Sequence, residues 1–204
     1  MKLYYMPGAC SLATHIVLNE VGASYELEKV DGATKQTEHG NDFREINPHG
    51  YVPALTLDTG DTLLEGASIL QYLADQQPDT TLAPASGTIE RARLQQHLNF
   101  VATELHKAFG PFFSGRDLSE DERAAAVANV SKKLTNFENI FADGRDYLLG
   151  SDFSVADAYL FVVTNWTNFT GIDLSPWPKM QAFQQRTAAR PAVLASLKAE
   201  GLMD

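Results

Sequence analysis

The sequence has almost no sulfur chemistry and no long apolar segment. Only one of its 204 residues is a cysteine, Cys10, so an intrachain disulfide is excluded. No stretch reaches the roughly 18 apolar residues of a membrane-spanning helix, and residues 1–20 lack the basic start and long apolar run of a secretory signal. We therefore expect a cytoplasmic protein with no membrane partner.

Positive charge is also scarce. The chain has 16 Lys and Arg against 26 Asp and Glu, which gives a formal net charge of -10 at pH 7. Because binding to nucleic acid or anionic lipid needs clustered cations, we expect neither partner. The 44% of hydrophobic residues is nonetheless enough for a substantial core, as in an ordinary globular protein.

The first 75 residues mix strand and helix patterns. Apolar runs predict strands over residues 2–6, 25–30, 52–57 and 62–64, and helical spacing predicts helices over residues 11–21 and 66–73. Residues 31–41 are polar and predict a loop, followed by at most a short helical turn at 43–46. This order predicts one small α/β domain over residues 1–77.

The rest of the chain reads as helices. Residues 78–87 have the composition of a linker, and residues 88–204 carry helical spacing that predicts an all-helical domain. Ser119 to Glu122 and Ser154 to Asp157 have the spacing of capping boxes, which explains Ser154 and Asp157 as helix starts rather than catalytic groups.

Cys10 lies between the end of a predicted strand and the first turn of a predicted helix. Unpaired N–H groups and the helix dipole favour a negative charge there, which would lower the pKa of the thiol and increase its reactivity. The alternative is a buried, inert packing residue, because free cysteines are among the most buried residue types.

Several motifs, in order, resemble the bacterial beta class of glutathione S-transferases over nearly the full length. They are KLYYMPGACSLATHIVL, NPHGYVPAL, LLEG, NFVATELHK and FSVADAYLF. The resemblance implies a thioredoxin-like N-terminal domain, an all-α C-terminal domain, glutathione as co-substrate and no metal. It also implies a homodimer and a role in detoxification.

The resemblance also implies where glutathione binds in the first domain. Val52 and the cis-proline Pro53 would pair with the cysteinyl part of glutathione, and Glu65 with Gly66 would hold its γ-glutamyl end. Gly66 departs from the Ser that is common elsewhere in the family. Lys35 aligns with a residue that binds the glycyl carboxylate. Without the resemblance, these residues are typical of an edge strand, a helix start and a solvated loop.

The helical domain supplies Asn99, Thr103 and His106, whose spacing of i, i+4 and i+7 places them on one helix face. Such a face is most often simply the wet side of a helix. The resemblance implies instead that the three line the glutathione thiol and the substrate pocket, within one subunit or across the dimer. His106 could hydrogen-bond a thiolate because imidazole titrates near neutral pH.

These expectations leave three functions open. The first is conjugation of glutathione to small hydrophobic electrophiles, with Cys10 and His106 as catalytic residues and Tyr5 and Ser11 as secondary candidates. The second is a glutaredoxin-like thiol transferase or peroxidase that works through a Cys10 mixed disulfide. The third is a non-catalytic ligand-binding protein. The electrophile is not identified; candidates for its pocket, or for ordinary core, are Phe109, Phe112, Phe113, Trp166 and Phe169.

Overall fold

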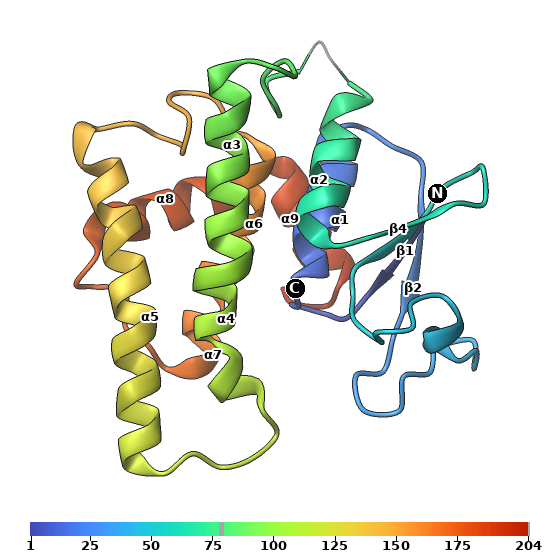
Figure 1. The fold of residues 1–204 in the computed structure, drawn as a ribbon, viewed down its shortest axis with the longest axis horizontal. Helices are drawn as coiled ribbons and strands as arrows, with labels where there is room; N and C mark the ends of the chain where they lie inside the picture. The colour runs from blue at the N-terminus through green and yellow to red at the C-terminus, as the bar shows by residue number, and fades with distance from the viewer. Residues whose placement is uncertain (78–79, 204) are drawn as a thin grey trace. The chain divides into compact units, whose positions relative to one another are not determined.

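The computed structural model describes residues 1–77 and 80–203 and divides into two compact units. The first unit comprises Met1–Thr80 together with Ala189–Asp204, and the second comprises Thr81–Ala188. The first combines strands with helices, and the second is helical (Figure 1). Pro78 and Asp79, with which the predicted linker begins, lie outside the described residues.

The first unit is built on a four-stranded mixed sheet of order β2-β1-β3-β4. β1 pairs in parallel with β2 and antiparallel with β3, and β3 pairs antiparallel with β4. The strands are short and lie where the apolar runs predict them: β1 (Lys2–Tyr5), β2 (Glu26–Lys29), β3 (Ala54–Thr56) and β4 (Thr62–Leu64). A single helical turn, η1 (Phe43–Glu45), follows the polar loop.

Helix α1 is the centre of the first unit. It packs against β1, α2 and α9, and the eight consecutive residues from Ser11 to Leu18 are buried. Within the described part of this unit, the α-helices are α1 (Ser11–Glu20), α2 (Gly66–Asp75) and α9 (Pro191–Ala199). The predicted helical domain, residues 88–204, includes α9, whereas in the structure α9 packs against α1 and belongs to the first unit.

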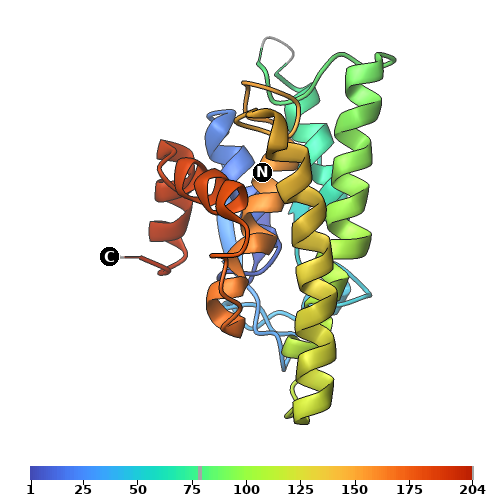
Figure 2. The same cartoon turned by 90° about the vertical axis from the view of Figure 1, so that its left-hand side faces the viewer.

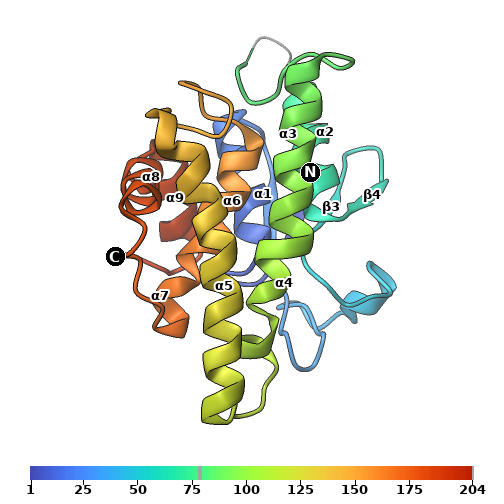
Figure 3. The same ribbon diagram turned by 60° about the vertical axis from the view of Figure 1, so that its left-hand side comes forward.

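The second unit is a bundle in which α5 lies beside the helix that contains α3 and α4 (Figure 2). α6 is buried over almost its whole length and contacts α3 and α8 (Figure 3). The α-helices of the second unit are α3 (Ile89–Phe100), α4 (His106–Ala108), α5 (Glu120–Ile140), α6 (Val155–Asn165), α7 (Thr167–Thr170) and α8 (Pro178–Ala188). Short turns η3 (Gly110–Phe113) and η4 (Phe141–Asp143) end two of them.

Both predicted capping boxes are present, at Ser119 and at Ser154. Asp157 accepts hydrogen bonds from the Ser154 backbone N–H at 2.9 Å and from the Leu148 N–H at 2.8 Å. Complete burial raises the pKa of the Asp157 carboxyl to about 6 in spite of these donors. Asp157 therefore serves the start of α6, as its position in the motif indicates.

Two features of the helical unit were not predicted. α7 is a four-residue turn that ends at Gly171 in the left-handed conformation. Between α3 and α4, a π-helical segment, η2 (Val101–Leu105), interrupts the regular α-helical spacing. Among the described residues, no helix combines the length and apolarity that crossing a bilayer requires.

Candidate functional site

The Cys10 thiol lies at the start of α1, facing the backbone of Val52. Cys10 is the N-cap residue of this helix, with φ -59° and ψ -21°, and it is half-buried. Its Sγ donates a hydrogen bond to the Val52 carbonyl oxygen at 3.2 Å. The Cys10 thiol therefore faces the segment that precedes Pro53. This defined contact distinguishes Cys10 from a cysteine that only fills the core.

The two secondary candidates, Tyr5 and Ser11, flank the loop that carries Cys10. The Ser11 hydroxyl contacts both the N–H and the carbonyl of Met6, at 3.2 and 3.3 Å, and is fully buried. Tyr5 is buried, and burial together with the charge of Glu200 raises the pKa of its phenol. Both side chains have structural surroundings, and their catalytic role stays a prediction.

Val52 and Pro53 lie immediately before β3. The Val52–Pro53 peptide bond is cis, and both residues are buried. The β1–β3 ladder begins only at Ala54, which pairs with Tyr4, so the backbone of Val52 lies outside it. An extended peptide can pair with backbone groups at such a position, beside the thiol of Cys10.

Glu65 and Gly66 form the beginning of α2. Glu65 is exposed and has φ 66°, a left-handed conformation that is costly for a residue other than glycine. A Cβ atom at Gly66 would lie 3.7 Å from Cγ of Pro53, so this helix start is adjacent to the proline. An exposed acid and a helix N-terminus thus adjoin the Val52–Pro53 segment, and such a strained residue is often functional.

Lys35 is the second non-glycine residue with a left-handed backbone, at φ 62°. Its N–H donates to the Asp31 carbonyl and its carbonyl accepts from the Phe43 N–H. The stem of its side chain lies over Gly50, where an added Cβ would be 3.4 Å from Cδ of Lys35. The polar loop therefore holds Lys35 near the residues that lead into Val52.

His106 in the second unit is enclosed by aromatic rings. Its Nδ1 lies 2.9 Å from the Tyr159 hydroxyl, and its ring packs edge-on against Trp166 with centroids 4.8 Å apart. Burial, with a smaller contribution from the charge of Lys107, lowers the pKa of His106 to about 4. The expectation that its imidazole titrates near neutral pH is wrong, because the half-buried ring stays neutral there.

Asn99 and Thr103 have different surroundings from His106. Both are exposed and line a cavity of about 560 Å³ between α3 and α5, where they meet Asn136 and Asn139. His106 is not among the residues that line this cavity and contacts Tyr159 of α6 instead. Thr103 lies inside the π-helical segment η2, between Asn99 and His106. The regular α-helical spacing that would place all three residues on one face is therefore interrupted.

An aromatic cluster surrounds Trp166, as several of the predicted pocket residues are on neighbouring turns. Trp166 is buried and packs edge-on against Phe109 and Phe113, with centroid distances of 5.7 and 5.3 Å. Phe113 and Phe169 are exposed, whereas Phe109 is fully buried. The cluster thus contains both buried and exposed aromatic rings. Its role in binding an electrophile stays a prediction.

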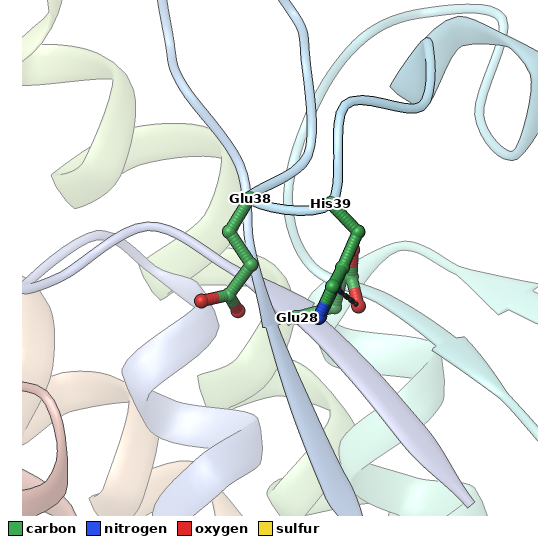
Figure 4. Close-up of side chains that lie close together, drawn as sticks. All are labelled: Glu28, Glu38 and His39. Carbon is green, nitrogen blue, oxygen red and sulfur yellow. Dashed lines mark hydrogen bonds and ion pairs between the residues drawn. The ribbon is translucent and has the colours of Figure 1, made fainter.

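A carboxylate-histidine group joins Glu28 of the edge strand β2 to Glu38 and His39 of the loop that follows it. Figure 4 shows the buried Glu28 joined to His39 Nδ1, at 2.8 Å, with the Glu38 carboxylate nearby. Burial would raise the pKa of Glu28, but hydrogen bonds from His39 and Thr37 outweigh it and hold the pKa below its usual value. Lys2 Nζ also lies 3.6 Å from the Glu28 carboxylate. The group is therefore explained by the need to compensate the buried charge of Glu28.

Sequence reasoning missed one contact at this site. The Gly8 N–H, two residues before Cys10, donates to Oε2 of Glu200 at 2.9 Å. The two residues are separated by 192 positions, so no local pattern could have indicated the contact. His15 is buried, and its Nδ1 lies 2.9 Å from the other oxygen of the same carboxylate.

Comparisons with known proteins agree with this geometry. Residues 8–76 match the model of the glutathione S-transferase N-terminal domain, and residues 100–191 match that of the C-terminal domain. The chain is 44% identical over 202 residues to glutathione S-transferase GstA of Escherichia coli O157:H7, covering 99% of this chain and 100% of that protein.

Two solved structures are similar over the full length of both chains. A sphingomonad glutathione S-transferase complexed with glutathione is 50% identical and superimposes with a TM-score of 0.94. A bacterial beta-class glutathione S-transferase from Sphingomonas chungbukensis is also 50% identical, with a TM-score of 0.95. The predicted fold class, a thioredoxin-like domain followed by helices, is confirmed.

The low pKa of the half-buried His106 predicts a pH-dependent stability. Between pH 6.5 and 4 the unfolded chain binds a proton at this imidazole that the folded chain does not, so the free energy of unfolding should fall as pH falls. In His106→Asn the contribution, a few kcal/mol at most, should disappear, so the two proteins should converge as pH falls toward 4. Urea unfolding at several pH values measures this.

The matched control is Tyr159→Phe, which removes the hydrogen bond to His106 but keeps most of its burial. Because burial is the main cause of the low pKa, this variant should keep the pH dependence of the wild-type protein. Parallel stability curves for the wild-type protein and His106→Asn would contradict the assignment.

Proposed function

Because this chain belongs to the glutathione S-transferase family and is an enzyme that uses glutathione as co-substrate, we propose how its residues perform the reaction. The first unit binds glutathione along the backbone at Val52 and at the start of α2. The thiol of glutathione loses its proton. The glutathione sulfur then forms a bond to the electrophilic carbon of a small hydrophobic compound, from which the leaving group departs.

One observation carries this proposal: the thiol of Cys10 lies 3.2 Å from the Val52 carbonyl oxygen. A cysteinyl residue of glutathione that pairs with the Val52 backbone would bring its own sulfur next to Cys10. This supports both conjugation at that point and a mixed disulfide with Cys10.

The charges of the first unit complement the ends of glutathione. The ligand has an α-amino group and two carboxylates. Glu65 supplies an acid for the amino group, the N–H groups at the start of α2 supply donors for one carboxylate, and Lys35 supplies a cation for the other. All of these lie in the same compact unit as Val52 and Cys10.

The contributions of Asn99, Thr103 and His106 to glutathione binding, and of the aromatic cluster to electrophile binding, stay predictions. His106 would act as a neutral hydrogen-bonding group, since its pKa of about 4 leaves it uncharged at neutral pH. A cytoplasmic location and a role in detoxification also stay predictions. The non-catalytic alternative is dropped, because the chain is a transferase.

The second candidate, thiol transfer through a Cys10 mixed disulfide, is favoured by the contact of Cys10 with Val52. In such a step the Cys10 thiolate attacks a glutathionylated disulfide, forms a protein–glutathione disulfide and releases the other thiol. Free glutathione then attacks this disulfide, which gives oxidised glutathione and restores the thiol.

Replacing Cys10 should separate the two activities. In Cys10→Ala, conjugation of glutathione to 1-chloro-2,4-dinitrobenzene should stay within about tenfold of the wild-type rate, because the conjugating sulfur is that of glutathione. Thiol transfer to a small mixed disulfide should be abolished, since it requires the Cys10 sulfur. Cys10→Ser is the control that keeps a hydroxyl near Val52. Loss of conjugation in Ala and Ser variants that still bind glutathione would show that Cys10 is needed for conjugation itself.

Removing the Glu65 carboxylate should weaken glutathione binding. Glu65→Ala leaves the bound ammonium without its charged partner, at a cost of about 1–3 kcal/mol, which is roughly 5- to 150-fold in Kd. Glu65→Gln keeps the side-chain shape and a hydrogen-bond acceptor, so its loss should be smaller. Isothermal titration with glutathione measures both, and an Ala variant with unchanged affinity would refute the role of Glu65.

We also propose a homodimer, as the sequence resemblance implies. Sedimentation equilibrium at micromolar concentration should give about twice the chain mass of 22.4 kDa. A mass near that of one chain would refute the dimer, and with it any role of Asn99 or Thr103 across an interface.

A further inference from the structure

The carboxylate of Glu200 links the end of α9 to the loop that carries Cys10. Its Oε2 accepts from the Gly8 N–H at 2.9 Å, and its Oε1 lies 2.9 Å from Nδ1 of His15. The side chains of Glu200 and His15 are both completely buried. With the Gly8 N–H donating to one oxygen and His15 Nδ1 facing the other, both carboxylate oxygens have a hydrogen-bond partner.

A buried carboxylate is stable only where its oxygens have good donors, so its place in the fold is closely defined. Glu200 has one donor from α1 and one from the loop before α1. Gly8 itself is in the left-handed conformation at φ +71°, and a Cβ there would lie 3.6 Å from Leu202. The segment after α9 thus contacts Gly8 by a charged hydrogen bond and by an apolar side chain.

Other contacts anchor α9 to α1 without touching the loop. The Arg190 guanidinium binds the Glu20 carboxylate at 2.8 and 3.0 Å, and Asn19 Nδ2 donates to Oγ of Ser196 at 2.8 Å. These bonds fix the helix, so Glu200 is presented to Gly8 from a rigid element. The contact is therefore separable from docking of the helix.

We propose that Glu200 is a positioning residue for the Cys10 thiol: held by His15, it fixes the Gly8 amide and thereby places Sγ of Cys10 opposite the Val52 carbonyl. Glu200 acts through Gly8 and touches neither sulfur nor Val52. This inference rests on the proposed function only for its effect on thiol transfer, because the placement of the thiol can be measured without glutathione.

The test compares Glu200→Ala with Ser196→Ala in the full chain. Both remove a hydrogen bond of a buried side chain near α9, but only the first frees Gly8. In Glu200→Ala, the amide NMR signal of Gly8 should move toward higher field, because the charged acceptor is lost. Alkylation of Cys10 by iodoacetamide should become faster, because a half-buried thiol bonded to Val52 is released. Thiol transfer should fall roughly tenfold in kcat/KM, the size expected for one charged hydrogen bond.

Conservative replacement provides the second readout. Glu200→Gln keeps an oxygen for the Gly8 N–H, and its amide N–H can donate to His15 Nδ1 when the ring carries its hydrogen on Nε2, so all three measurements should stay near those of the wild-type protein. Ser196→Ala should leave the Gly8 signal and the alkylation rate unchanged, whatever it does to the melting temperature.

The proposal is overturned if Glu200→Ala has the Gly8 signal and alkylation rate of the wild-type protein, or if Ser196→Ala changes both equally. If Glu200→Ala does not fold, Glu200→Asp replaces it. Its shorter side chain cannot reach both His15 and Gly8, so a wild-type Gly8 signal and alkylation rate in that variant would equally refute the proposal. Altered alkylation without any thiol transfer in the wild-type protein would instead refute the proposed redox function and leave the positioning role intact.

Discussion

Burial of α1 on every side is the constraint on which the first unit depends. Eight consecutive residues of this helix are buried, and they include Ser11, Thr14 and His15, whose polar atoms cannot reach water. Polar groups in such a place need partners inside the protein. The Ser11 hydroxyl pairs with Met6 and His15 Nδ1 pairs with Glu200, whereas Thr14 Oγ1 and His15 Nε2 have no hydrogen-bond partner among the described residues. The conformation of the loop between β1 and α1 therefore depends in part on hydrogen bonds with buried polar groups of the helix.

This constraint connects packing with chemistry. Cys10 directly precedes the buried stretch of α1 and is itself half-buried, so its thiol is partly accessible while its Sγ is held by the Val52 carbonyl. Two left-handed residues, Lys35 and Glu65, lie on either side of the Val52–Pro53 segment in the chain. The interior of the unit is mainly apolar, with a few buried polar groups such as His15 and Glu200, whereas the charged groups that suit glutathione lie at its surface and at helix starts.

The fold was predictable from sequence to the extent that it is encoded locally. Apolar runs and helical spacing located the strands and most helices, and the serine at each capping box marked the start of α5 and α6. The π-helical turn after Phe100 was not predictable, because its sequence VATEL has no feature that distinguishes it from an α-helix. The neutrality of His106 was missed for a related reason: it depends on burial by Tyr159 and Trp166, about 53 and 60 residues away. The Glu200 contact with Gly8 is the extreme case of such distant pairing.

The return of α9 to the first unit also affects the order in which the chain can fold during synthesis. The second unit is one continuous segment, Thr81–Ala188, so all of its residues leave the ribosome before α9 does. The first unit is discontinuous, because α1 is covered in part by α9. His15 consequently has no carboxylate partner until Glu200 has left the exit tunnel, so the unit that is translated first is the one that finishes folding last.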